Sequence, residues 1–417
     1  MKTLQVANSF NFTKMPFGDK SVSHRALILA AIACEPSTYN NMGICDDVLS
    51  TADCLVKLGA KISFDGEKAT VIPFEKANND VILNCGNSGT TARLLGGLVS
   101  GLGIKAKFIG DKSLTNRPIR IIEPLTAMGA KITQAKDCLF EINPSVIKGI
   151  TFQTPYISAQ IKSAVLLAGL NADGETTVIE KVITRMHTEN MLKAFGGNII
   201  ENNKGLYNEI TVKKSPLKGV NMTVPNDFST AAFLLPLGLK YGIKIENVLL
   251  SKERTGFLRL LEKAGAEIKV VQTGDFCGEP TGDVTVYHSE IKPFTVEAKD
   301  VSDMIDEIPV ACVTACLADG VSEFYGLSEL KYKESDRITE TANLIKSIGC
   351  RAEILDDGLL IQGNGKIDGG IINPNGDHRI AMSAVTAGIL SDKGVTVKGA
   401  ECIGVSSRNF LKMLGLE

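Results

Sequence analysis

Positively charged side chains stand beside turn or helix-capping residues at several well-separated points of this chain. Ser, Asp or Asn at a helix start is explained by capping of free backbone N–H groups. A cation in the first helical turn, such as Lys20 or Arg25, opposes the positive end of the helix dipole unless an anion binds there. Each cation alone is typical of a solvated surface, but together they predict a small substrate that carries phosphate and carboxylate groups. The set comprises Lys20, Arg25, Arg93, Arg117, Arg185, Lys331, Lys333, Arg337 and Arg379.

Sequence signatures of nucleotide binding and of nucleophilic catalysis do not occur in the chain. The stretch Gly86-Asn87-Ser88-Gly89-Thr90 suggests a phosphate loop, but neither GxxxxGK(S/T) nor GxGxxG is present, which disfavours ATP and NAD. There is no GxSxG elbow, and no cysteine has a context that marks a nucleophile. Acid–base chemistry by carboxylates and lysine remains.

Composition and charge indicate a globular enzyme rather than a nucleic-acid or membrane protein. Lys and Arg number 45 against 47 Asp and Glu, so the chain has no general basic field and any anion site must be local. No apolar leader follows Met1, and the apolar runs are too short to span a membrane, so we expect a cytoplasmic protein. Four scattered histidines and ten cysteines without a CxxC pair predict no metal, no disulfide framework and no cofactor.

A weak signature recurs six times: an apolar residue, three residues, Gly, a small residue and commonly Ile. Gly can adopt the left-handed conformation that ends a helix, so each copy predicts a helix that stops at Gly before a strand. More apolar helices rich in Ala and Gly are predicted between these copies, and they should be buried. The glycines are Gly59, Gly129, Gly196, Gly265, Gly349 and Gly415, and the apolar helices span 21–33, 88–100, 158–170, 227–239, 302–317 and 377–389.

Six units of about 70 residues predict an α/β chain of two domains with three units each. The last unit ends shortly after its helix-stop Gly415, so another segment must supply its strand, and residues 4–12 are the candidate. We therefore expect one domain at 18–226 and the other at 1–17 plus 227–417. Pro-containing and Gly-containing stretches at 16–18 and 224–226 are the expected hinges.

Seven stretches of the chain, in order, resemble the 5-enolpyruvylshikimate-3-phosphate (EPSP) synthase family, and the resemblance runs nearly end to end. One such string would be weak support, whereas seven in the family's order are specific. The stretches are Asp19-Lys20-Ser21-Val22-Ser23-His24-Arg25-Ala26, Gly86-Asn87-Ser88-Gly89-Thr90, Asn116-Arg117-Pro118-Ile119, Ser158-Ala159-Gln160-Ile161-Lys162-Ser163-Ala164, Ile305-Asp306-Glu307-Ile308-Pro309, Lys333-Glu334-Ser335-Asp336-Arg337 and Asp377-His378-Arg379-Ile380-Ala381-Met382.

The resemblance implies a fold, a reaction and a set of site residues. The fold is two domains, each of three βαβαββ repeat units with buried central helices, an inside-out α/β barrel, with the active site in the interdomain cleft. The reaction adds the 5-hydroxyl of shikimate 3-phosphate to phosphoenolpyruvate and then expels phosphate. Asp306, Glu334 and Lys20 would be catalytic. Shikimate 3-phosphate would be bound by Lys20, Ser21, Arg25, Ser158, Gln160, Arg185, Asp306 and Lys333, and phosphoenolpyruvate by Lys20, Gly89, Arg117, Gln160, Arg337 and Arg379.

Two rival functions share this scaffold. The related transferase that acts on UDP-N-acetylglucosamine typically carries a reactive loop Cys and lacks the Lys-Glu-Ser-Asp-Arg and Asp-His-Arg strings, both of which are present here. A noncatalytic anion-binding protein gives no reason to place Asp306 and Glu334 among cations. The family often has a lysine near the end of the chain that contacts phosphoenolpyruvate. No such lysine is found here, and Arg408 is the candidate for its place. The partners expected are the two small anionic substrates, with a monomeric chain, no nucleic acid and no membrane.

Overall fold

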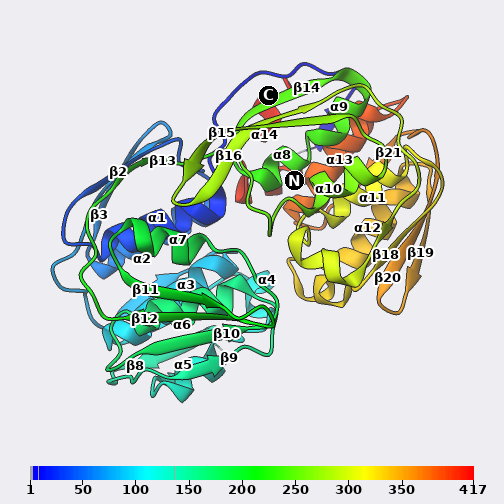
Figure 1. The fold of residues 1–417 in the computed structure, drawn as a ribbon. Coiled ribbons are helices and arrows are strands. Elements are labelled where there is room, and N and C mark those ends of the chain that lie inside the picture. Colours follow the sequence, from blue (N-terminus) through cyan, green and yellow to red (C-terminus); the bar gives the residue numbers. More distant parts are fainter. Residues whose placement is uncertain (1–2, 8, 136) are drawn as a thin grey trace. The chain divides into compact units, whose positions relative to one another are not determined.

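The computed structural model describes residues 3–7, 9–135 and 137–417. The chain divides into two compact units. The first unit is Gly18–Val224, and the second unit combines Met1–Phe17 with Pro225–Glu417. Figure 1 shows strands lying outside helices in each of them. No helix among the described residues combines the length and the apolarity needed to cross a membrane.

The described strands of the first unit form three four-stranded sheets with one shared topology. In each sheet an outer strand runs parallel to its neighbour, and the remaining pairings are antiparallel. The last strand of the unit pairs with its first sheet, at Met222 opposite Tyr39. The sheets are β13 (Asn221–Thr223), β2 (Ser37–Asn40), β4 (Lys68–Ile72) and β3 (Lys61–Asp65); β5 (Val81–Asn84), β6 (Ala106–Ile109), β8 (Phe140–Asn143) and β7 (Lys131–Thr133); and β9 (Thr151–Gln153), β10 (Thr176–Glu180), β12 (Asn208–Lys213) and β11 (Asn198–Asn203).

The described strands of the second unit also form three sheets, two of them with three strands. An outer strand pairs parallel with its neighbour in two of the sheets, whereas both pairings among β14, β16 and β15 are antiparallel. Strand β1 from the start of the chain pairs antiparallel with β22 near its end, at Leu4 opposite Val397. This confirms that the N-terminal stretch supplies a strand to the last repeat. The sheets are β14 (Ile243–Leu249), β16 (Glu279–Val286) and β15 (Ile268–Phe276); β17 (Thr295–Val296), β18 (Asp319–Tyr325), β20 (Gly358–Asn364) and β19 (Arg351–Leu355); and β21 (Gly370–Ile372), β22 (Val395–Lys398) and β1 (Thr3–Val6).

Helices fill the inside of both units. Those of the first unit are α1 (Lys20–Ala31), α2 (Asp46–Leu58), α3 (Gly89–Leu102), α4 (Lys112–Thr115), α5 (Ile122–Ala127), α6 (Ala159–Gly169) and α7 (His187–Ala194). Those of the second unit are α8 (Phe228–Ala232), α9 (Leu235–Tyr241), α10 (Gly256–Lys263), η1 (Ala298–Asp303), α11 (Ile308–Ala315), η2 (Ser328–Tyr332), α12 (Arg337–Ser347), α13 (His378–Leu390), η3 (Ala400–Val405) and α14 (Phe410–Met413).

Glycine residues end one helix of each repeat and allow the helices α3 and α6 to pack closely. All six predicted helix-stop glycines have positive φ, from 66° at Gly415 to 113° at Gly59, which confirms the repeat. Helices α3 and α6 pack so closely that a Cβ on Gly97 would lie 2.1 Å from the carbonyl O of Ala164. No side chain fits there, so the small residues of these helices are a packing requirement.

Two apolar segments that were predicted as single helices are not. The segment 302–317 is helical only from Ile308, because the residues before it form the 3-10 helix η1 and a turn, and Pro309 lies in the first turn of α11. The segment 227–239 divides into α8 and α9, with Pro236 at the start of α9. Proline lacks the backbone N–H that a continuous helix requires, so both proline positions are helix starts.

Candidate active site

The N-terminus of α1 presents the first cation of the predicted site. Asp19 caps the helix by accepting a hydrogen bond from the backbone N of Val22 at 2.8 Å. Lys20 Nζ lies 3.0 Å from Asp47 Oδ2 at the start of α2, and the two side chains are 14% and 10% exposed. Ser21 follows in a half-buried position. Asp19 therefore caps this helix start, and Asp47 holds the side chain of Lys20.

Arg25 joins three helices of the first unit. Its Nε donates to Thr188 Oγ1 of α7 at 2.6 Å, and its Nη2 donates to Ser163 Oγ of α6 at 2.8 Å. Nη1 donates to the backbone carbonyl of Ser21, one turn earlier on α1, at 2.9 Å. The side chain is buried, so these three neutral acceptors replace the hydrogen bonds to water that the guanidinium loses.

Helices α3 and α6 bring a second group of predicted residues together. Gln160 Oε1 accepts from Arg93 Nη1 at 2.7 Å, and its amide donates to Thr90 Oγ1 at 2.9 Å. A Cβ on Gly89 would lie 2.4 Å from Arg93 Nη1 and 3.5 Å from Arg117 Nη1. Gly89 therefore leaves the space that the two guanidinium groups occupy beside the start of α3.

Arg117, Ser158 and Arg185 complete the set on the first unit. Arg117 is buried, and its Nη2 donates to the backbone O and to Oδ1 of Asn87 at 2.9 and 2.6 Å. Ser158 caps α6, with its Oγ accepting from the backbone N of Ile161 at 3.4 Å. Arg185 is half-buried in the segment that connects β10 to α7.

His24 begins a chain of side-chain hydrogen bonds that connects α1, α2 and α3. Its Nδ1 lies 2.7 Å from Thr51 Oγ1, which lies 2.7 Å from Thr91 Oγ1, which in turn donates to Ser88 Oγ at 2.7 Å. Burial, reinforced by the positive charges of Lys20 and Arg25, holds the pKa of His24 well below its ordinary value of 6.5. The imidazole is therefore neutral in the folded protein.

The neutral His24 predicts a loss of stability in mild acid. Below pH 6.5 the unfolded chain protonates this histidine while the folded chain does not. Stability then falls as the pH decreases, by up to about 1.4 kcal/mol per pH unit. We expect His24→Gln to flatten the dependence of the free energy of unfolding on pH between 5 and 6.5, measured by urea denaturation. Replacing the exposed His288 by Gln should leave the slope intact. Equal slopes for wild type and His24→Gln would contradict the assignment.

Arg337 is the centre of the charged group on the second unit. Its Nε donates to Asp377 Oδ2 at 2.8 Å, its Nη2 to Glu334 Oε2 at 2.5 Å, and its Nη1 to Asp306 Oδ1 at 3.5 Å. The side chain is 1% exposed. Burial opposes the charge, but the carboxylates of Asp377, Glu334 and Asp306 outweigh it and raise the pKa of Arg337. The guanidinium is permanently charged and oriented by three acids.

Asp306 and Glu334 differ from Asp377 in their access to water. Both side chains are 19% exposed, whereas that of Asp377 is fully buried. Asp306 lies in the turn before α11, and Glu334 lies in the turn before α12, next to the half-buried Lys333. These two carboxylates therefore contact Arg337 and are also partly exposed to solvent.

Arg379 lies in the first turn of α13. Its backbone N donates to Asp377 Oδ1 at 2.9 Å, so Asp377 both caps this helix and binds Arg337. Its guanidinium carbon lies 5.7 Å from the centre of the Phe233 ring. Arg408, the candidate for a late cation that contacts phosphoenolpyruvate, is exposed in the turn after η3.

Two charged partners were not recognised from sequence. One is Asp47, which pairs with Lys20. The other is Arg254, which lies 3.1 Å from Asp227 Oδ1 and donates to Ser229 Oγ at 2.7 Å. Asp227 caps α8 and also holds this buried cation. Alignment of the repeats could have found this pair, since Arg254 precedes α10 as Arg337 begins α12.

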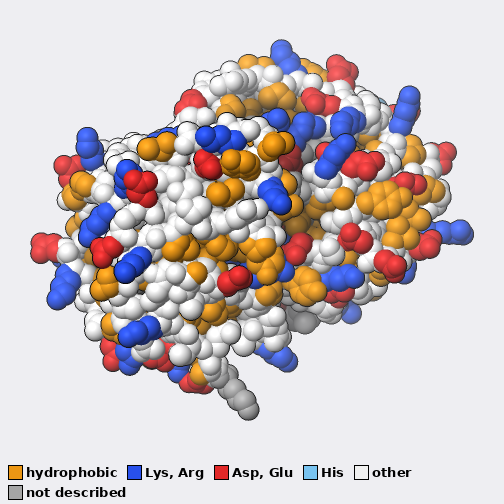
Figure 2. All heavy atoms as spheres, turned by 60° about the horizontal axis from the view of Figure 1, so that its bottom comes forward, with side chains coloured by type: hydrophobic (Ala, Val, Ile, Leu, Met, Phe, Trp, Pro, Cys, Tyr) orange, Lys and Arg blue, Asp and Glu red, His pale blue; other side chains and the backbone are white. Residues whose placement is uncertain are grey.

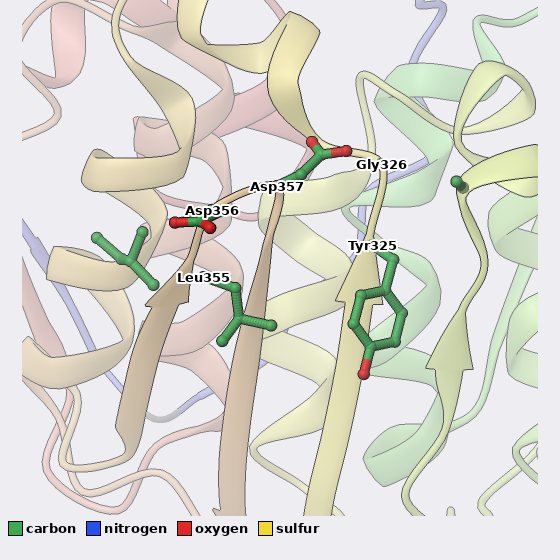
Figure 3. Close-up of a pocket in the computed structure, with 7 residues that line it drawn as sticks. Tyr325, Gly326, Leu355, Asp356 and Asp357 are labelled. Atoms are coloured by element: carbon green, nitrogen blue, oxygen red, sulfur yellow. The ribbon is translucent and has the colours of Figure 1, made fainter.

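On the face shown in Figure 2, basic and acidic side chains are interspersed. One open pocket of about 580 Å³ lies at the ends of β18 and β19, where Figure 3 shows Asp356 and Asp357 beside Tyr325. Its acidic charge has the wrong sign for anionic substrates, and the Asp357 carboxylate accepts from the backbone N of Ser328 at 2.6 Å. The pocket contains none of the predicted site residues.

The fold is that of solved enolpyruvyl transferases. The enolpyruvyl transferase NikO from Streptomyces tendae shares the fold with a TM-score of 0.78 at 15% identity, over 99% of this chain and 96% of that chain. EPSP synthase from Acinetobacter baumannii superposes with a TM-score of 0.85 at 33% identity, over 99% of this chain and 97% of that chain.

Sequence similarity defines the family. The family model of EPSP synthase (3-phosphoshikimate 1-carboxyvinyltransferase) matches residues 14–414. The 3-phosphoshikimate 1-carboxyvinyltransferase of Sulfurihydrogenibium sp. is 40% identical over an alignment that covers 95% of this chain and 94% of the relative. The chain therefore belongs to the EPSP synthase family. It is a transferase that moves the enolpyruvyl group of phosphoenolpyruvate to shikimate 3-phosphate in aromatic amino acid biosynthesis.

Proposed function

We propose that the residues predicted from sequence bind and convert these two substrates. Shikimate 3-phosphate is bound by Lys20, Ser21, Arg25, Ser158, Gln160, Arg185, Asp306 and Lys333, and phosphoenolpyruvate by Lys20, Gly89, Arg117, Gln160, Arg337 and Arg379. The observation that carries the proposal is the pair of partly exposed carboxylates, Asp306 and Glu334, on the buried Arg337. Anion binding alone has no use for carboxylates among cations, whereas proton transfer requires them.

The proposed mechanism assigns one proton transfer to each carboxylate. Asp306 orients the 5-hydroxyl of shikimate 3-phosphate and accepts its proton as the oxygen bonds to C2 of phosphoenolpyruvate. Glu334 supplies the proton that C3 takes. C3 then returns that proton to Glu334 as the bond from C2 to the phosphate oxygen breaks, and phosphate leaves with the proton that Asp306 accepted. Lys20 stabilises the negative charge of the reactants as a point charge.

Glu334 must be protonated to act as an acid, although Arg337 favours its ionised form. Removal of water by the bound substrates raises the free energy of the charged carboxylate and so favours the protonated one. The two anionic substrates add negative charge near Glu334 and act in the same direction. Substrate binding therefore prepares the proton donor.

We further propose that the chain acts as a monomer in the cytoplasm, without nucleic acid. The near balance of 45 basic and 47 acidic residues supports the absence of a nucleic-acid partner. Each assigned residue belongs to the same chain, so the proposal requires no second copy.

Phosphate release tests the proposed binding roles. Wild-type protein should release phosphate from phosphoenolpyruvate with shikimate 3-phosphate, and should not when UDP-N-acetylglucosamine replaces the shikimate compound. We expect Arg25→Gln to raise the KM for shikimate 3-phosphate, and Arg379→Gln the KM for phosphoenolpyruvate, each by about 10- to 100-fold, as for a lost charged hydrogen bond. Reaction with the UDP sugar, or a reversed pattern of KM changes, would overturn the proposal.

A further inference from the structure

Lys162 is completely buried on helix α6 of the first unit. Its Nζ lies 2.9 Å from Glu180 Oε1 and 2.7 Å from Glu189 Oε1, and neither carboxylate side chain is more than 2% exposed. The same ammonium donates to the backbone O of Thr184 at 3.2 Å. One cation therefore holds two buried carboxylates and a carbonyl.

The groups that Lys162 binds follow one another along the chain. Glu180 is the last residue of β10, and Glu189 lies in the first turn of α7. Thr184 lies between them, and its hydroxyl donates to Glu180 Oε2 at 2.8 Å. Lys162 Nζ on α6 thus contacts the segment that carries Arg185 at both of its ends and in its middle.

The same network reaches a second cation of the proposed substrate site. Glu189 directly follows Thr188, whose hydroxyl accepts from Arg25 Nε at 2.6 Å. Ser163 directly follows Lys162, and its hydroxyl accepts from Arg25 Nη2 at 2.8 Å. The two hydroxyls lie 2.6 Å apart. The position of α7 relative to α6 therefore sets the position of Arg25 as well as that of Arg185.

Stability alone does not account for this buried group. Burial raises the pKa of Glu189, and the attraction of Lys162 only partly opposes this. Apolar side chains of similar volume are commonly as stabilising as a buried ion pair, because they avoid the loss of hydration. The ion pairs do fix distances between the elements they connect, which apolar contacts do less strictly.

We propose that Lys162 is a positioning residue for shikimate 3-phosphate: it binds Glu180 and Glu189 and thereby places Arg185 and, through α7, Arg25. The inference rests on the proposed assignment of Arg185 and Arg25 to this substrate. It predicts that loosening the α7 end of the network affects shikimate 3-phosphate and leaves phosphoenolpyruvate unaffected.

The test uses Glu189→Gln in the full-length chain. The amide keeps the size of the side chain and leaves Lys162 balanced by Glu180, so folding is expected to survive. We expect the KM for shikimate 3-phosphate to rise roughly tenfold, with the KM for phosphoenolpyruvate unchanged in the folded variant. Glu180→Gln, which loosens the strand end, should give the same selective rise. Glu175→Gln, which removes an exposed partner of Lys213, is the matched control and should change neither constant.

Arg185→Ala separates this inference from the proposed function. Because Glu189 acts through both Arg185 and Arg25, adding Glu189→Gln to Arg185→Ala should raise the KM for shikimate 3-phosphate by a smaller factor than Glu189→Gln does in the wild type. The positioning role would be overturned if the rises in KM caused by Glu189→Gln and Arg185→Ala multiplied fully in the double variant. It would also be overturned if an amide variant raised both KM values equally, or if both folded amide variants left them unchanged. An unchanged KM in Arg185→Ala itself would remove Arg185 from the proposed binding site, and this inference with it.

Discussion

Glu334→Gln and Asp306→Asn are each expected to lower kcat for phosphate release by about 10²- to 10⁴-fold, the usual contribution of a general acid or base. Both substitutions keep the size of the side chain and an oxygen that can accept a hydrogen bond from Arg337. Neither amide can transfer a proton at neutral pH. The loss should therefore appear in kcat, with smaller changes in either KM.

Asp303→Asn provides the matched control for these two variants. Asp303 ends η1, three residues before Asp306, and its carboxylate contacts the partly exposed Arg259 at 2.5 Å. Its replacement should leave kcat close to that of the wild type. A rate near wild type in Glu334→Gln or in Asp306→Asn would remove that residue from the mechanism.

Arg337→Met is expected to destabilise the second unit by about 3–5 kcal/mol, the cost of removing one partner from a buried ion pair. Asp377 would remain fully buried, with Glu334 and Asp306 nearby and no guanidinium to balance their charge. Methionine fills part of the space but donates no hydrogen bond. Urea denaturation gives the difference in the free energy of unfolding.

Arg259→Met tests whether burial is the cause of this effect. Arg259 also contacts an aspartate, Asp303, but its side chain is 39% exposed. Exposed ion pairs contribute at most about 1 kcal/mol, so this variant should be close to wild type. If Arg337→Met were as stable as Arg259→Met, the negative charges of the three carboxylates would not need Arg337 to balance them.

Features that depend on one residue's own backbone were well predicted from sequence. Each helix-stop glycine requires a left-handed φ wherever it occurs, and all six adopt it. The segment 302–317 was wrongly predicted as one helix because hydrophobicity does not mark where a turn replaces the first helical residues. Pro309 was the local sign of the true start, since proline is favoured in the first turn.

The partners of the charged residues could not be predicted, because they come from distant parts of the chain. Asp377 lies 40 residues from Arg337, and Thr188 lies 163 residues from Arg25. Sequence patterns place each side chain at a helix start but do not say which helix starts meet. The proposed site residues could be named, whereas the acids and hydroxyls that orient them required the coordinates.

The pairing of β1 with β22 has a consequence for the order in which the two units fold during translation. Thr3 is opposite Lys398, so β1 can join its sheet only after β22, which lies far later in the chain, has been synthesised. Gly18–Val224, being continuous, can fold while translation proceeds. Substitutions that prevent β1 from pairing with β22 should therefore impair the folding of the second unit far more than that of the first.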